Sequence, residues 1–213
     1  MELTNCLDND REPLSASFWD VRPDGEWAGE GRRHYRDVIY PMVFSWLRFH
    51  DGHLTGHGLE LCGGNGEFAK DLLGQDFARD IRSYSLVDLN HVSIESAREH
   101  LADNHAVHIV EDSICNEAVY SDACARAGTK LDFVIGIGAL TACVLGSKRD
   151  AITALGYAAS SLRDGGMILL AGRAGSWIDS SDLMASGFRV EETYFGSRPF
   201  YVGIKDIYDL GIF

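Results

Sequence analysis

The residues with the clearest potential for chemistry lie in a glycine-rich turn near residue 60. The segment Leu59-Glu60-Leu61-Cys62-Gly63-Gly64-Asn65-Gly66 reads as a short apolar strand that breaks into a turn, and Glu67–Leu73 continues as a helix. Glycines at a strand-to-helix turn let a ligand approach the backbone and leave helix N–H groups pointing at it. Gly64-Asn65-Gly66 with Ala69 also satisfies the Gly-x-Gly-x-x-Ala fingerprint of dinucleotide-binding proteins. The turn therefore predicts a nucleotide-like ligand.

Glu60 favours a cationic ligand over a dinucleotide. It lies inside the predicted strand, between Leu59 and Leu61, where burial of a carboxylate is costly unless the group is paired or solvated. A pyrophosphate would be repelled by this anion, whereas a sulfonium amino acid would be attracted to it. The alternatives are an edge carboxylate that faces water and a structural ion pair with an arginine.

Two further carboxylates follow the next predicted strands. Asp88 ends the strand Ser83–Asp88, about 20 residues after the glycine turn, where a carboxylate can accept both hydroxyls of a ribose. Asp112 follows the strand Ala106–Val110, where an acceptor could take the exocyclic amine of adenine while Ile114 covers the ring. The structural alternatives are an Asp that starts a turn at 88 and a helix N-cap at 112.

Alternating strands and helices would position these residues. The predicted strands are Leu59–Cys62, Ser83–Asp88, Ala106–Val110, Leu131–Ile137 and Met167–Ala171, and the helices between them are Glu67–Leu73, Val92–Asp103 with Asn90 as N-cap, Asn116–Ala127 and Arg149–Leu162. Strands separated by helices imply right-handed crossovers and a parallel sheet that is covered on both faces. Such sheets bind ligands at the carboxyl ends of their strands.

The C-terminal region departs from that alternation. After a short helix at about Ser181–Ala185, both Phe188–Phe195 and Phe200–Lys205 read as strands, and only Gly196-Ser197-Arg198-Pro199 lies between them. This connection is too short for a crossover helix, so the two strands must be antiparallel neighbours. The predicted fold class is α/β: a single doubly wound, mostly parallel sheet that ends in an antiparallel hairpin, with helices on both faces.

Composition limits the classes of function. The chain has 213 residues, 46% of them hydrophobic, which suits one globular domain, and its formal net charge is −13. A nucleic-acid partner is disfavoured because no basic stripe is present to neutralise phosphates. The odd number of cysteines, 5, without any C-x-x-C spacing, predicts a reducing, cytoplasmic setting. No apolar run approaches the roughly 20 residues that span a bilayer, and Met1–Glu12 lacks the pattern of a secretory signal.

The glycine turn with Glu60, the carboxylates Asp88 and Asp112, and the apolar strand Asp132–Gly136 together resemble the class I S-adenosylmethionine-dependent methyltransferases. The resemblance covers about residues 55–207. It implies a seven-stranded Rossmann-like sheet with an antiparallel last-inserted strand, and S-adenosyl-L-methionine as cofactor with S-adenosyl-L-homocysteine as product.

The resemblance also implies roles for individual residues. Glu60 would lie near the methionine amino group, and Asp88 would hold the ribose. The remaining implied contacts are the loop residues Cys62, Gly64 and Gly66, Leu89 beside the adenine, Asp112 and Ser113 at the adenine edge, and the Gly136 backbone near the methionine moiety. Cys62 departs from the family, which has its first loop glycine here, and we expect it to crowd the backbone slightly.

The first 50 residues are expected to form a lid or helical segment packed on the core domain of residues 51–213. Apolar residues recur at helical spacing from Tyr35 to His50, which predicts an amphipathic helix. Phe18-Trp19-Asp20 and this helix resemble the entry segment of small-molecule methyltransferases, which folds over the cofactor. Trp19 and Tyr35 are therefore candidates to line the pocket, and core packing is the alternative for these aromatics.

Absent motifs narrow the acceptor. The fourth strand leads into Ile135-Gly136-Ile137-Gly138-Ala139, without the Asp/Asn-Pro-Pro-Tyr of nucleic-acid amino-methyltransferases, and no carboxylate follows Asp132 until Asp150. We therefore predict metal-independent methyl transfer to a small molecule by direct displacement. No catalytic base is assigned among the histidines (34, 50, 53, 57 and 91), and the oligomeric state is left open. Two alternatives are an NAD(P)-dependent oxidoreductase and a protein that binds S-adenosylmethionine without transferring its methyl group.

Overall fold

The computed structural model describes residues 35–49, 54–141, 144–171, 176–195 and 198–206. Trp19, the histidines 34, 50 and 53 and most of the predicted lid segment lie outside these ranges, so the proposed division at residue 50 stays a prediction. No helix in the described part of the chain is both long and apolar enough to cross a membrane.

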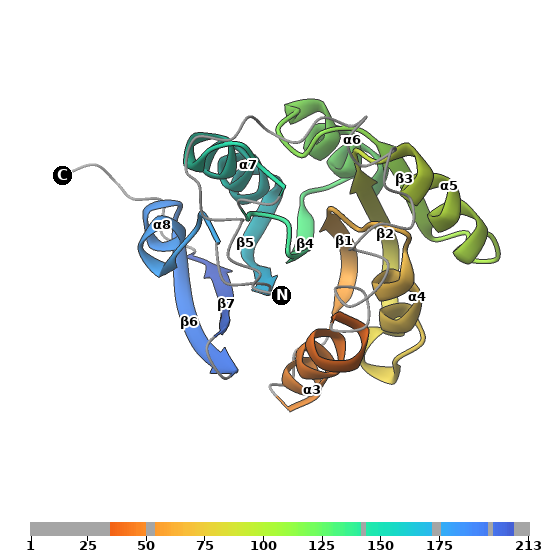
Figure 1. Ribbon diagram of the computed structural model, residues 1–213, viewed down its shortest axis with the longest axis horizontal. Coiled ribbons are helices and arrows are strands. Elements are labelled where there is room, and N and C mark those ends of the chain that lie inside the picture. The colour runs from red at the N-terminus through yellow and green to blue at the C-terminus, as the bar shows by residue number, and fades with distance from the viewer. Residues whose placement is uncertain (1–34, 50–53, 142–143, 172–175, 196–197, 207–213) are drawn as a thin grey trace, which may run out of the picture.

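A seven-stranded sheet with the order β3-β2-β1-β4-β5-β7-β6 forms the centre of the protein (Figure 1). Strands β1 to β5 are parallel, whereas β7 runs antiparallel to both β5 and β6. The seven strands are β1 Thr55–Leu61, β2 Asp80–Asp88, β3 Val107–Glu111, β4 Leu131–Ile137, β5 Leu162–Ala171, β6 Phe188–Phe195 and β7 Arg198–Lys205. The predicted fold, including the antiparallel hairpin, is confirmed.

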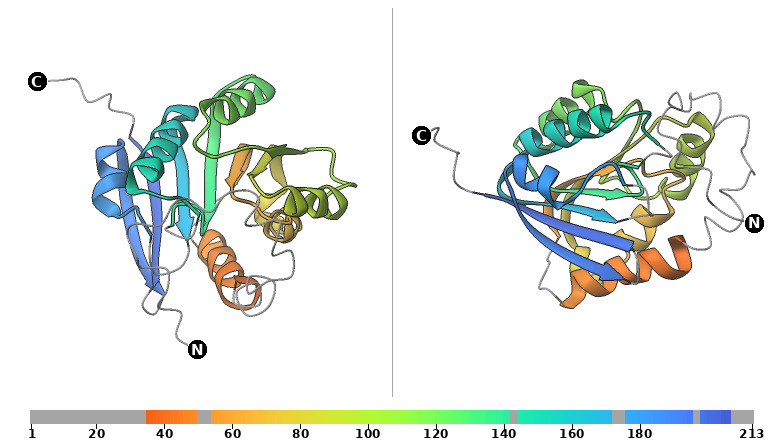
Figure 2. Two further views of the ribbon diagram at one scale, coloured as in Figure 1. Left: turned by 45° about the horizontal axis from the view of Figure 1, so that its top comes forward. Right: turned by 60° about the vertical axis from the view of Figure 1, so that its left-hand side comes forward.

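Helices cover both faces of the sheet, as the two views of Figure 2 show for α6 and α7 on one face and α3 and α4 on the other. The α-helices are α3 Tyr40–Phe49, α4 Glu67–Leu73, α5 His91–His100, α6 Glu117–Ala127, α7 Lys148–Ser161 and α8 Ser180–Ala185, with short turns η3 Tyr35–Ile39 and η4 Asp76–Ala78. Apolar side chains alternate along the inner strands. Leu59 and Leu61 pack under α6 and α7, while the side chain of Glu60 between them faces the layer of α3, α4 and α5.

Several boundaries differ from the predicted ones. β1 begins at Thr55, four residues before the predicted start at Leu59. The additional residues were missed because Thr55 to His57 are exposed or half-buried and show no apolar pattern. The helix expected to reach Asp103 ends at His100, and the helix expected from Arg149 begins at Lys148, after Ser147, whose side chain caps it. Asn90 caps α5 as predicted, accepting a hydrogen bond from the Ser93 backbone N–H at 2.9 Å.

The helix expected at Tyr35–His50 begins with a π-helical turn, Tyr35–Ile39, before α3. Val43 and Leu47 of α3 are buried in the core and so place the helix against the sheet, and Tyr35 is buried as well. Single π-helical turns are often found at functional sites.

Candidate functional site

The parallel register brings the predicted site residues to one edge of the sheet. Leu61 at the end of β1 pairs with Val87 of β2 and with Gly136 of β4. Asp88 of β2 pairs with Glu111 at the end of β3, and the Asp112 backbone N–H donates to the Asp88 carbonyl at 3.0 Å. The residues that follow β1, β2, β3 and β4 therefore meet at the carboxyl ends of these strands, where open α/β sheets bind ligands.

The glycine loop between β1 and α4 has three residues with positive φ: Cys62 at 55°, Gly64 at 56° and Gly66 at 76°. A Cβ atom on Gly66 would lie 2.9 Å from Leu101 Cδ1, so this glycine lets the loop pack against α5 and its C-terminal cap. A Cβ on Gly64 would meet nothing within 4 Å, so at Gly64 glycine is favoured by the backbone conformation, and the space beside it is open.

Cys62 shows why the position usually holds glycine. The expectation was a slight crowding of the backbone, and the structure gives a more specific cause, since Cys62 is the one described non-glycine residue with positive φ. A side chain in the left-handed region costs about 1–2 kcal/mol. Burial raises the pKa of the Cys62 thiol well above its usual value, and the nearby Asp88, Cys115 and Glu60 act in the same direction. Cys62 is thus a neutral thiol in a strained loop.

Glu60 is buried in the sheet, with 2% of its surface exposed. Its carboxyl accepts a hydrogen bond from the Tyr84 hydroxyl at 2.9 Å, and Tyr84 is itself fully buried. Burial is the main cause that raises the pKa of Glu60 to about 8, Asp88 adds to the rise, and the Tyr84 hydrogen bond opposes it. The structure excludes an edge carboxylate that faces water, and no arginine of the described ranges pairs with Glu60.

Asp88 holds the glycine loop at the end of β2. Its two carboxylate oxygens accept the backbone N–H groups of Gly64 at 2.9 Å and Asn90 at 2.8 Å. Burial raises the pKa of Asp88, and these hydrogen bonds oppose the rise. Each oxygen has a second lone pair, so ribose hydroxyls could still donate to it. Leu89 follows with 41% of its surface exposed, and its role beside the adenine stays a prediction.

Asp112 and Ser113 make local contacts in the turn after β3. Asp112 accepts from the Ser113 backbone N–H at 2.6 Å and from Asn116 Nδ2 at 2.9 Å, and Ser113 Oγ accepts from the Cys115 backbone N–H at 3.2 Å. The N-cap of α6 is Asn116 and not Asp112, which removes that structural alternative. Both residues lie beside Asp88, and their role toward adenine stays a prediction.

Gly136 and Gly138 lie near the end of β4, and Tyr35 packs against the second of them. A Cβ on Gly136 would lie 3.0 Å from Leu170 Cδ2 and 3.2 Å from Ala139 Cβ, so glycine permits close packing of β4 on β5 here. A Cβ on Gly138, two residues later, would lie 2.7 Å from the Tyr35 hydroxyl oxygen. Tyr35 is 6% exposed and belongs to the core layer of α3, so it packs over the end of β4 as a core residue beside the site.

Two functional candidates, Tyr84 and Tyr40, were not identified from the sequence. Tyr84 donates a hydrogen bond to Glu60. Burial raises the pKa of Tyr40, and so does the charge of Glu60, which shows that the Tyr40 phenol lies near this carboxyl. The spacing of Tyr84 and Leu86 already predicts that both lie on one face of β2. The missing information was the register between β1 and β2, which puts that face beside Glu60.

The described histidines are spread over the molecule, and His100 of α5 contacts the glycine loop, with its Nδ1 2.8 Å from the Asn65 carbonyl oxygen. His57 Nδ1 lies 2.7 Å from Ser83 Oγ in the amino-terminal half of the sheet, and His91 Nδ1 lies 2.9 Å from Glu111 Oε2 on the surface. Within the described ranges, no group of three or more His, Cys, Asp or Glu side chains could hold a metal ion. Metal independence stays a prediction.

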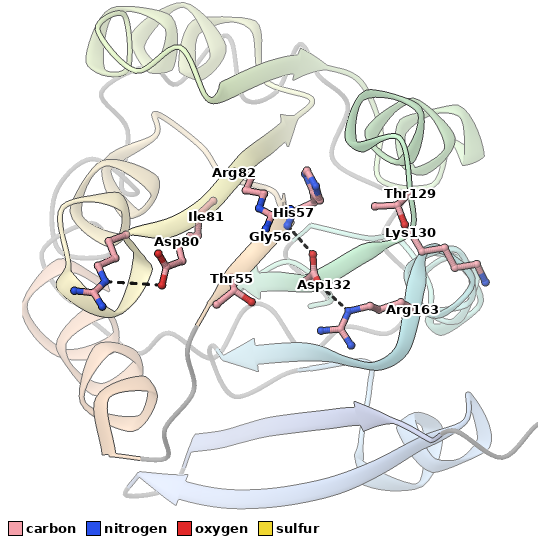
Figure 3. A pocket seen from close by; sticks show the side chains of 11 residues that line it. Thr55, Gly56, His57, Asp80, Ile81, Arg82, Thr129, Lys130, Asp132 and Arg163 are labelled. Carbon is pink, nitrogen blue, oxygen red and sulfur yellow. Dashed lines mark hydrogen bonds and ion pairs between the residues drawn. The ribbon is translucent and has the colours of Figure 1, made fainter.

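A cavity of about 690 Å³ lies at the opposite, amino-terminal edge of the sheet (Figure 3). Its centre is Asp132, which accepts the His57 backbone N–H at 2.8 Å and Arg163 Nε at 2.6 Å, as the dashed lines show. A Cβ on Gly56 would lie 2.0 Å from Asp132 Oδ2, so the carboxylate fills the space that this glycine leaves. We interpret the cluster as a structural link between β1, β4 and β5, because parallel sheets bind ligands at the other edge.

No protein-family model matches the sequence, and no curated protein matches it. Solved structures do match. An O-methyltransferase family protein from Burkholderia thailandensis aligns with a TM-score of 0.64 at 16% identity, over 96% of this chain and 67% of that one. Magnesium protoporphyrin IX methyltransferase from Synechocystis PCC 6803, with bound SAM, aligns at 0.57 and 17% identity, over 82% and 81%.

A third match is CalS10 from Micromonospora echinaspora, an amino pentose methyltransferase with bound SAM, with a TM-score of 0.57, 12% identity and coverage of 78% and 90%. At these identities the likeness concerns the fold. The sheet order 3-2-1-4-5-7-6, the antiparallel β7 and the glycine loop after β1 agree with it. This chain has the Rossmann-like fold of the class I S-adenosylmethionine-dependent methyltransferases.

Proposed function

We propose that this protein binds S-adenosyl-L-methionine at the carboxyl edge of its sheet and transfers the methyl group to a small-molecule acceptor, without a metal. The observation that carries the proposal is Glu60. A buried carboxyl beside a glycine loop, with no cation of the described ranges near it, suits a ligand that brings its own positive charge. An ammonium group supplies this charge, whereas a pyrophosphate brings no positive charge to the carboxyl.

The other site residues take the roles that their positions suggest. Asp88, at the end of β2, would accept the ribose hydroxyls, and Leu89 would cover one side of the adenine. Residues expected to contact the remaining parts of the cofactor are Cys62, Gly64 and Gly66 in the loop, Asp112 and Ser113 at the adenine edge, Gly136 near the methionine moiety, and Trp19 and Tyr35 in the lining of the pocket.

A small-molecule acceptor agrees with two observations. The net charge of −13 disfavours a polyanionic acceptor, and several structurally similar proteins have small acceptors in their names, among them an amino pentose and magnesium protoporphyrin IX.

Direct displacement at a sulfonium methyl group requires in-line alignment of the acceptor and exclusion of water. When bound, the cofactor supplies the activated methyl group. The chain's own contribution is to bind the cofactor and to orient it toward the acceptor. Glu60 and Asp88 would fix the two ends of the cofactor, and the buried face of α3 keeps water from the side of Glu60.

Calorimetric titration of the purified protein with S-adenosylmethionine, S-adenosylhomocysteine and NADH tests the cofactor. We expect micromolar binding of both adenosyl compounds, no binding of NADH, and at least a tenfold loss of affinity in Asp88→Ala because two charge-assisted hydrogen bonds are removed. Asp122→Ala, an exposed carboxylate on α6, serves as the matched control and should bind as the wild type does.

The same titration separates the alternatives. Binding of NADH alone would contradict the proposal and favour the oxidoreductase. Binding of S-adenosylmethionine without formation of S-adenosylhomocysteine, across a panel of hydroxyl, amine and thiol acceptors, would leave a cofactor-binding protein without methyl transfer.

A further inference from the structure

Glu60 and Tyr84 form a buried pair on neighbouring strands of the candidate site. The Tyr84 hydroxyl donates to Glu60 Oε2 at 2.9 Å, and this is the one hydrogen bond that the described residues give to the carboxyl. In the register of β1 and β2, Glu60 lies opposite Leu86, two residues beyond Tyr84. The hydroxyl therefore reaches the carboxyl from the amino-terminal side of the strands, opposite to the edge at which a ligand would enter.

The titratable groups that surround this pair are acidic. The charge of Asp88 on β2 raises the pKa of Glu60. The charge of Glu60 in turn raises the pKa of Tyr40 on α3 and of Cys62 in the glycine loop. The pKa of Tyr40 is also raised by three groups that lie near it, which are Glu67 and Asp71 of α4 and Tyr35 of η3. The β4 neighbour is the apolar Ile135. No lysine, arginine or histidine of the described ranges acts on Glu60.

This surrounding determines the charge of Glu60 without ligand. Since its pKa is raised to about 8, mainly by burial, the carboxyl carries a proton at neutral pH. The Tyr84 phenol keeps its own proton, because burial and Glu60 raise its pKa well above the usual value. Tyr84 can therefore donate to Glu60 in both charge states of the carboxyl, and it must be the donor once Glu60 is charged, so its hydrogen bond favours the charged form of Glu60.

We propose that Tyr84 is a positioning residue for the cationic end of the cofactor: it orients Glu60 and stabilises its charged form, and cofactor uptake releases the Glu60 proton to solvent. The inference rests on the proposed function, because the group that pairs with the carboxylate is the cofactor ammonium. The step is balanced, since the carboxylic acid loses one proton to the buffer, the carboxylate then pairs with the ammonium, and no covalent bond to the cofactor forms.

Proton release is measured first, with S-adenosylhomocysteine as the probe. Calorimetry at pH 7 in phosphate and in Tris, whose ionisation enthalpies differ, should show release of about one proton per site in the wild type. Affinity should rise about tenfold per pH unit from pH 6 up to about pH 8 and then level off. Glu60→Gln should release no proton and bind independently of pH, since its amide cannot titrate.

Tyr84→Phe tests the positioning role. Loss of the hydroxyl should move the midpoint of the pH dependence upward by about one unit and weaken binding about tenfold at pH 7, with most of the loss recovered at pH 9. The matched control is Tyr120→Phe, because the Tyr120 hydroxyl is also buried but donates to the Ile114 carbonyl, at 2.8 Å, on the other face of the sheet. Its midpoint should stay at the wild-type value.

Urea unfolding of the ligand-free proteins gives a second readout that needs no cofactor. The pKa of Glu60 is raised from about 4.5 to about 8, so the folded state keeps a proton that the unfolded chain loses. Burial of Glu60 therefore costs no stability through its charge below pH 4.5, and this cost grows as the pH rises to about 8. Relative to Glu60→Gln, the wild type should lose stability across this window, and in Tyr84→Phe the window should extend to higher pH.

The outcomes are distinguishable. If S-adenosylhomocysteine binds without proton release, or if Tyr84→Phe keeps the wild-type midpoint in both readouts, the positioning role is wrong and the proposed function stands. If the wild type binds neither adenosyl compound at any pH, the proposed function fails and with it the cofactor-linked proton release. Unfolding then still shows whether Tyr84 controls the charge of Glu60.

Discussion

At the scale of single residues, the candidate site combines two unfavourable features, a strained backbone at Cys62 and an acidic group buried at Glu60. Neither adds to the stability of the ligand-free fold. Groups of this kind are found where a ligand completes their environment, because their cost is offset only in the bound state. Their coincidence at the end of β1 is the strongest structural indication of where the ligand binds.

The strain at Cys62 leads to a test with paired variants. Cys62→Gly should be more stable than Cys62→Ala by about 1 kcal/mol, because glycine adopts positive φ freely and alanine does not. The comparison between Gly and Ala variants cancels the loss of the sulfur atom. Urea denaturation at fixed pH measures the difference.

Cys124 is the matched control, since it lies inside α6 with helical backbone geometry. There the order should reverse, with Cys124→Ala more stable than Cys124→Gly by about 1 kcal/mol. An alanine variant at position 62 as stable as the glycine variant would mean that the loop relaxes around the side chain, and the strain argument would fail.

At the scale of secondary-structure elements, Lys205 fixes the end of α7 to the antiparallel hairpin. Its Nζ donates to the Ala159 carbonyl at 2.6 Å and to the Leu162 carbonyl at 2.9 Å, which are free carbonyls at the C-terminus of this helix. Burial lowers the pKa of Lys205, and the opposing effect of nearby Asp164 is smaller. The contact joins β7 to the layer that supports β4 and β5.

Lys205→Met should therefore destabilise the protein by about 1–3 kcal/mol, since two buried carbonyls lose a charged donor while the apolar stem is retained. Lys148→Met at the other end of the same helix is the control. The Lys148–Asp182 ion pair, at 2.9 Å, is solvent-exposed on the lysine side, so its loss should cost much less stability than the loss of the Lys205 contacts. Equal losses in the two variants would contradict a specific role for Lys205. Urea midpoints at pH 7 provide the comparison.

At the scale of the whole molecule, the two edges of the sheet have different tasks. The carboxyl edge holds the glycine loop, Glu60 and Asp88, whereas the amino edge holds the link of Asp132 with Arg163 and the His57 backbone (Figure 3). Our proposal assigns ligand binding to the first edge, whereas the contacts at the second join β1, β4 and β5.

Asp132→Ala is expected to separate these tasks. It should lower the free energy of unfolding by about 1–3 kcal/mol, because the His57 N–H and the Arg163 guanidinium lose their acceptor. Affinity for S-adenosylhomocysteine, measured by calorimetry well below the unfolding transition, should change less than twofold. A large loss of affinity would show that the two edges are coupled, or that the cavity at the amino edge contributes to binding.

The sequence was sufficient to predict the order of elements and the strand ends that carry the candidate site residues. The alternation of strands and helices, together with the short connection before β7, predicted the sheet, and Glu60, Asp88 and Asp112 were placed at strand ends correctly. The pairing of Tyr84 with Glu60 could not be predicted, because it depends on the register of two strands. The positive φ of Cys62 likewise follows from loop closure against β2 and has no signal in the residue type.

The outermost strand β6 protects the rest of the sheet from other chains. A strand at the edge exposes unpaired N–H and C=O groups that can template pairing and aggregation. β6 has exposed charges at Arg189 and Glu191, which discourage such pairing. Behind it, β7 has the buried apolar run Phe200-Tyr201-Val202. Local unfolding that detaches β6 would expose this run as an unpaired apolar edge. The resistance of the protein to aggregation at high concentration therefore depends on a strand far from the candidate site.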